Sequence, residues 1–133
     1  MSPEVIARKL SRMSRYLRDL APYREAAYRD FMADHYKVER LLELLLMTAS
    51  DIVFHLLAVQ DEPAPSSYRA AFLRSGEMGI LSEELSRNLA LGAGLRNILV
   101  HEYEEIDYAL LHAGIPQITE DLIDFVEQVS NRL

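Results

Sequence analysis

The sequence predicts an all-α fold, a compact bundle of about five helices in a single domain of residues 1–133. Half of the 133 residues are hydrophobic, and only five are glycine. Leu, Ala, Glu and Arg, all strong helix formers, dominate the composition. Apolar residues recur at helical spacing along most of the chain, and no segment alternates as a strand does. A domain of this length can bury a substantial core without disulfides.

The first predicted helix runs from Ser2 to about Leu20. Ser2 suits an N-cap, and Pro3 suits the first helical position. Apolar residues then repeat with the helical period: Val5, Ile6, Leu10, Met13 and Leu17. The opposite face carries the densest basic cluster of the chain: Arg8, Lys9, Arg12, Arg15 and Arg18. We interpret this cluster as an exposed helix face, with RNA contact as the alternative.

A second helical segment is predicted to begin near Tyr23, with Asp34 as its break or as a cap. Its apolar stripe contains Tyr23, Ala27 and Phe31. A third segment, residues 38–57, is apolar around much of its circumference, which predicts the central helix of the bundle.

Asp51 and His55 lie at positions i and i+4 of the predicted central helix. Because no third ligand is spaced to join them, a buried polar pair or an exposed salt bridge is favoured over a metal site. The same helix is the most apolar stretch of the chain, but Glu43, Asp51 and His55 interrupt it. A buried helix is therefore expected here, and no membrane span.

The second half of the chain contains the clearest loop, residues 61–67, followed by a short helical segment at 68–74 and a turn at 75–79. A new helix is predicted from Ser82, because Glu83 and Glu84 complement the dipole of its first turn. Gly92 and Gly94 lower helix stability, so we predict that another backbone approaches closely there. The last helix is expected over residues 119–129, after Pro116.

Composition excludes several classes of function. No cysteine is present, which rules out disulfides, thiolate metal sites and a cysteine nucleophile. The first residues lack the apolar core of a signal peptide, so a cytoplasmic location is predicted. The net charge is −7, unlike that of a general nucleic-acid binder. Chemistry on nucleic acid would therefore depend on a local basic patch.

The most informative segment is residues 96–103, Arg-Asn-Ile-Leu-Val-His-Glu-Tyr. Arg96 offers a permanent charge and a planar fork that suits phosphate oxygens. His101 can take and give a proton near neutral pH. With 12 arginines and four histidines in 133 residues, chance alone predicts roughly 0.4 pairs at this spacing. The spacing alone is therefore not specific.

The string from Gly94 to Tyr103 resembles the signature of the HEPN ribonuclease toxins, and most closely the HepT-like branch that is paired with a minimal nucleotidyltransferase antitoxin. Residues 36–42, 51–56, 82–85 and 105–107 extend the resemblance over most of the chain. The resemblance implies a compact α-helical homodimer that cleaves RNA without a metal or cofactor. It also implies silencing by a partner that adenylylates a tyrosine.

Carried over to matching positions, the resemblance implies that Arg96 and His101 are catalytic and that Tyr103 is the site of AMPylation. Asn97 is assigned a supporting role that orients the imidazole or the phosphate, with a capping or simply solvated side chain as the alternative. Five residues of α-helix turn about 140° and rise about 7.5 Å, so Arg96 and His101 of one chain do not share a stripe. Two copies of the helix that meet across a twofold axis would bring such a pair together more easily.

Two alternatives to the ribonuclease remain open at the level of sequence. The motif could build the interface of a non-catalytic helical dimerisation or adaptor protein, which the acidic balance favours. The same Arg/His pocket could bind a nucleotide. The predicted partners are RNA, the cognate nucleotidyltransferase antitoxin and a second copy of the chain, with assembly beyond a dimer left open.

Overall fold

The computed structural model describes residues 2–100 and 105–133, with the backbone alone for residues 96–100. The described residues form α1 (Pro3–Leu20), η1 (Ala21–Tyr23, a 3₁₀ turn), α2 (Tyr28–Ala33), α3 (His35–Val59), α4 (Tyr68–Glu77), α5 (Glu83–Val100) and α6 (Tyr108–Ser130). Helices are the only regular elements in these ranges, which confirms the predicted all-α class.

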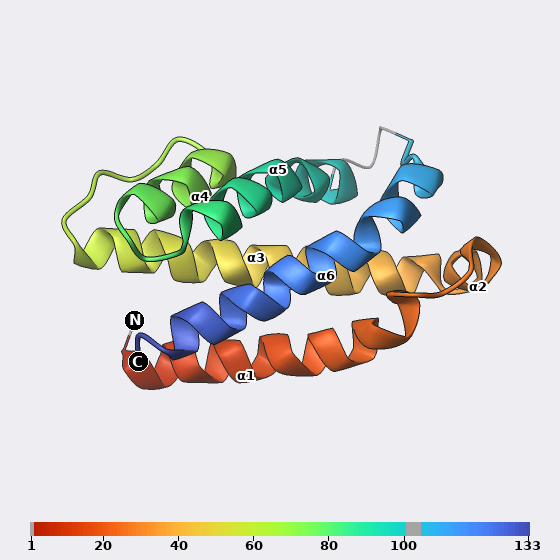
Figure 1. The fold of residues 1–133 in the computed structure, drawn as a ribbon, viewed down its shortest axis with the longest axis horizontal. Coiled ribbons are helices and arrows are strands. Elements are labelled where there is room, and N and C mark those ends of the chain that lie inside the picture. Colours follow the sequence, from red (N-terminus) through yellow and green to blue (C-terminus); the bar gives the residue numbers. More distant parts are fainter. Residues whose placement is uncertain (1, 101–104) are drawn as a thin grey trace.

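The helix α3 lies at the centre of the bundle. It packs against α1 along one side and against the α4–α5 pair along the other (Figure 1). By length and composition α3 could cross a membrane, but 11 of its 25 residues are buried against the other helices. Burial around so much of its circumference is what a core helix requires. The prediction of a central helix is confirmed.

The helix α1 follows the predicted pattern. The Ser2 hydroxyl accepts a hydrogen bond from the backbone N–H of Val5 at 3.3 Å, and Pro3 opens the helix. Its buried residues repeat every three or four positions: Ile6, Leu10, Met13, Leu17 and Leu20. This stripe packs on α3 and α6, so the arginine face points away from the core.

The predicted second segment is shorter than expected. Tyr23 closes the 3₁₀ turn, and α2 begins only at Tyr28. Asp34 separates α2 from α3 as predicted, but its side chain makes no capping hydrogen bond. The reason is a long-range partner: the Tyr23 hydroxyl donates to the Asp34 carboxylate at 2.7 Å.

The helices α4 and α5 pack closely against each other at Gly76. The predicted turn at 75–79 is wrong in its first half, because α4 continues to Glu77 and the chain turns at Gly79, where φ is +72°. A Cβ atom at Gly76 would lie 2.1 Å from the Ser86 hydroxyl oxygen. Glycine at position 76 therefore lets α4 and α5 approach each other.

The predicted backbone approach at Gly92 and Gly94 is wrong. Among the described residues, a Cβ atom at Gly92 would meet only the side chain of Ile118, at 2.9 Å, and one at Gly94 would meet nothing within 4 Å.

The last helix is much longer than predicted. It begins at Tyr108, where the Asp107 carboxylate accepts from the N–H of Leu110 at 3.1 Å, and it runs through Pro116. Proline inside a helix typically costs about 3 kcal/mol. One buried stripe continues across the proline and offsets that cost: Leu111, Ile115, Ile118, Leu122 and Phe125.

Candidate functional site

The Arg96–Tyr103 segment begins within α5, which ends at Val100, and α6 follows from Tyr108. Arg96 and Asn97 belong to the last turns of α5, with side chains outside the described part. His101 and Tyr103 lie outside the described residues. Convergence of these four side chains stays a prediction.

The start of α6 is held to α3 by Tyr108, five residues after Tyr103. The Tyr108 hydroxyl donates to Oε2 of Glu39 at 3.4 Å, and Nδ1 of His35 lies 2.6 Å from the same oxygen. The rings of His35 and Tyr108 meet edge to face with centroids 4.8 Å apart. Burial, followed by the nearby Glu39 charge, raises the pKa of the Tyr108 phenol. This contact fixes the start of α6 against α3.

A second histidine holds α2 against α6 at the same end of the bundle. Nε2 of His112 lies 2.7 Å from the carbonyl oxygen of Ala26. Its ring packs against Tyr28 and Phe31, with centroids 5.4 and 5.3 Å away. His112 therefore has a role in packing, as His35 does.

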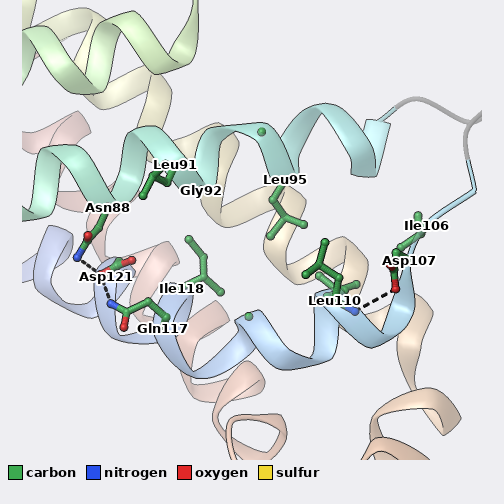
Figure 2. Close-up of a pocket in the computed structure, with 13 residues that line it drawn as sticks. Asn88, Leu91, Gly92, Leu95, Ile106, Asp107, Leu110, Gln117, Ile118 and Asp121 are labelled. Carbon is green, nitrogen blue, oxygen red and sulfur yellow. Dashed lines mark hydrogen bonds between the residues drawn. The ribbon is translucent and has the colours of Figure 1, made fainter.

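An open groove of about 480 Å³ lies between α5 and α6, beside the motif (Figure 2). Its walls are apolar: Leu91, Leu95, Ile106, Leu110, Leu111 and Ile118. Two of these side chains, Leu91 and Leu110, are 74% and 67% exposed. Large hydrophobic side chains that line one groove together are typical of interaction surfaces.

One end of this groove is polar. The carboxylate of Asp121 is buried and accepts hydrogen bonds from Gln117 at 2.8 Å and Asn88 at 3.3 Å (Figure 2). Burial raises the pKa of the Asp121 carboxyl, and the two hydrogen bonds oppose that rise. The neighbouring acids Glu84 and Glu120 raise it further.

Neither the described residues nor the predicted Asp51/His55 pair suggests a metal site. Among the described residues, no three His, Asp or Glu side chains are grouped so that they could hold an ion. The Asp51 carboxylate forms a salt bridge with Lys9 of α1 at 3.9 Å, and it is half exposed. Asp51 is thus paired with another helix, and a direct pair between Asp51 and His55 stays a prediction.

With the fold in place, comparison with known proteins identifies the family. The profile of the family described as "Ribonuclease HepT-like" matches residues 10–129, almost the whole chain. The chain belongs to the HepT-like ribonuclease family. The matched range includes α3, α5 and the Arg96–Tyr103 segment, where the resemblance was first found.

Two HepT relatives carry nuclease names. The tRNA nuclease HepT of Aphanizomenon flos-aquae is 30% identical over 136 aligned positions, which cover 100% of this chain and 92% of that protein. The mRNA nuclease HepT of Shewanella oneidensis is 30% identical over 79 positions, or 59% of each chain.

Solved structures share the HepT-like fold. A Shewanella oneidensis HEPN toxin, tri-AMPylated and in complex with an MNT antitoxin, superposes with a TM-score of 0.84 at 23% identity, over 98% of this chain and 99% of that one. A toxin–antitoxin complex with AMP-PNP gives a TM-score of 0.82 at 21% identity, over 98% of both chains. These likenesses confirm the HEPN-like bundle.

Sequence reasoning missed the residues that support the motif from outside. Glu39 and Tyr108 are 69 residues apart, and Asn88 and Asp121 are 33 apart. No local pattern links residues at such separations. The single available signal was the apolar period through residues 111–122, which extends α6 back toward the motif.

Proposed function

We propose that this chain is a metal-independent endoribonuclease, the toxin of a toxin–antitoxin pair that acts in the cytoplasm. The observation that carries the proposal is the Arg96-x4-His101-x-Tyr103 string within a family match over residues 10–129. Relatives named tRNA and mRNA nucleases support RNA as the substrate class.

The chemistry is an intramolecular attack of a ribose 2′-hydroxyl on the adjacent phosphate. His101 removes the hydroxyl proton as general base, the bond from phosphorus to the 5′-oxygen breaks, and an acid returns a proton to that oxygen. The products are a 2′,3′-cyclic phosphate and a 5′-hydroxyl. General acid–base catalysis contributes about 10²–10⁴-fold. Arg96 stabilises the charge that grows on the non-bridging oxygens, and Asn97 orients the imidazole or the phosphate.

The active species is a homodimer, with the α5–α6 groove as part of the interface. The groove adjoins the motif, and its exposed Leu91 and Leu110 side chains supply apolar area for a partner. A twofold axis beside the end of α5 would bring Arg96 and His101 of both copies into one composite site.

The antitoxin silences the enzyme by attaching AMP to Tyr103. The structural neighbour described as a tri-AMPylated toxin in complex with an MNT antitoxin supports this switch. An AMP group adds bulk and a phosphodiester anion next to the place where the RNA phosphate would bind. That anion can pair with Arg96 through charge-assisted hydrogen bonds and repel the substrate.

A cleavage assay tests the proposal. Wild type should cleave tRNA or total RNA in EDTA and leave 2′,3′-cyclic phosphate ends, whereas His101→Ala should lose about 10²–10⁴-fold in rate. Arg87→Ala is the matched control, because Arg87 is exposed on the same helix and precedes the motif. Activity that requires a divalent ion, or products with a plain 3′-hydroxyl, would contradict the mechanism. A dimer that cleaves no RNA would favour the adaptor function.

Mixed dimers test the composite site. Arg96→Ala and His101→Ala chains are each inactive as homodimers if both residues act. A verified heterodimer should regain activity if one site can be assembled from the intact residues of the two chains. Heterodimers without any activity would show that the site needs both copies of each residue, or both residues from one chain.

A further inference from the structure

The helix α1 runs along one edge of the bundle (Figure 1). Its exposed residues include a row of arginines. Arg8, Arg12, Arg15 and Arg18 are all exposed, and with Ser11 and Ser14 they line a shallow hollow. We call these four arginines the α1 arginine row. From the first to the last, the row spans ten residues, or about 15 Å of helix.

The α1 arginine row differs from several arginines elsewhere that are paired with carboxylates. Arg74 bonds to Glu62 and Glu77, Arg24 bonds to Glu120, and Arg40 bonds to Glu43. Within the described part of the chain, none of the four guanidinium groups of the row has a carboxylate partner. These four unneutralised positive charges on one face repel one another, although the protein contains 21 acidic residues that could neutralise them.

The charge of the chain is divided unevenly between α1 and the rest. The α1 segment holds five basic and two acidic residues, which leaves nine basic and 19 acidic residues for the other segments. The motif itself sits in acidic sequence, because Glu102, Glu104, Glu105 and Asp107 follow Arg96 closely. An RNA backbone would therefore be repelled at the site of chemistry unless another surface attracts it.

We propose that the α1 arginine row is an accessory surface that binds the sugar–phosphate backbone of the substrate RNA, an inference that rests on the proposed ribonuclease function. The α1 arginine row is better suited to bind the phosphate oxygens of RNA than to bind a protein partner. A protein interface needs an apolar centre, whereas serines lie between these arginines. The described large hydrophobic side chains that are exposed all lie outside α1. The row is long enough to contact several successive phosphates of one strand.

Salt-dependent binding tests the row. The probe is a fluorescently labelled tRNA transcript, titrated with full-length protein made inactive by His101→Ala, between 50 and 200 mM KCl. Arg12→Gln/Arg15→Gln removes two contacts, which should reduce the slope of log K against log salt by about 1.4–1.8. Relative to a reference at 1 M salt, that change weakens binding roughly 25-fold or more at 100 mM. Arg69→Gln/Arg87→Gln, on α4 and α5, is the charge-matched control and should leave the slope unchanged.

In otherwise wild-type protein, the α1 double variant should lower kcat/KM on tRNA and leave kcat at saturating RNA unchanged. An unchanged slope in a variant with wild-type thermal melting would overturn the proposal. A variant that binds RNA as the wild type does but no longer binds the co-expressed antitoxin would also overturn the proposal, because the row would then be a protein-binding surface. If the wild-type protein cleaves no RNA, the proposed ribonuclease function is refuted. The salt dependence of RNA binding would still decide whether the row binds RNA.

Discussion

The dimer can be tested by truncating Leu91 and Leu110 to alanine. Full burial of a leucine stabilises by about 2 kcal/mol, and 74% and 67% of these side chains remain to be covered. Each is therefore worth about 1.4 kcal/mol at an interface. In a twofold dimer each is buried twice, which gives about 5.6 kcal/mol. Truncation to alanine removes about two-thirds of that, so the dimer Kd should rise roughly 10³-fold.

The monomer should tolerate the same change. Both leucines are exposed on helices, and alanine is the best helix former, so the free energy of unfolding should move by less than about 0.5 kcal/mol. Sedimentation velocity over a dilution series measures the Kd, and thermal melting at low concentration measures the fold. Val59→Ala is the control, because Val59 is 65% exposed at the end of α3, outside the groove.

Two results would refute this reasoning. An unchanged Kd in the double variant would place the interface on another face of the bundle. A monomeric variant that cleaves RNA at the wild-type rate would show that the site is complete within one chain.

Three further predictions concern single residues. Tyr103→Phe should keep most of the ribonuclease activity but gain no AMP mass when co-expressed with the nucleotidyltransferase, and it should stay toxic. Gly76→Ala should destabilise by about 1–3 kcal/mol, because its Cβ would overlap Ser86, whereas Gly94→Ala should stabilise by about 0.5–1 kcal/mol. Asp121→Asn should raise the Tm at pH 7, since the raised pKa of that carboxyl means that its ionisation destabilises the folded state as the pH rises.

Each of these predictions has an outcome that contradicts it. A Tyr103→Phe protein that gains the AMP mass and stays non-toxic would exclude Tyr103 as the switch. Equal melting temperatures for the two glycine variants would refute the close contact between α4 and α5. The gain from Asp121→Asn should shrink as the pH falls through the raised pKa of the folded carboxyl, and it should vanish below about pH 4, where the unfolded carboxyl is protonated too. A gain that does not change with pH would mean that burial of charge is not its cause.

The sequence by itself determined those features that depend on near neighbours in the chain. A stripe such as Leu10, Met13 and Leu17 predicts both a helix and its buried face, because the period of 3.6 residues is a local property. The arginine face of α1 and the identity of the central helix were predictable in the same way. The motif at residues 96–103 was also legible, since its resemblance rests on residue types at fixed spacing.

The tertiary structure decided what depends on distant partners. Pro116 predicts a helix end locally, yet burial of Ile115 and Ile118 against the bundle holds α6 together across it. Gly76 carries no local sign that Ser86 fills the space beside it. The clamp from Tyr108 to Glu39 joins residues that only the packing of α6 on α3 brings together. Local propensities differ by about 1 kcal/mol per residue or less, and proline inside a helix costs about 3 kcal/mol, so the burial of several large side chains overrides them.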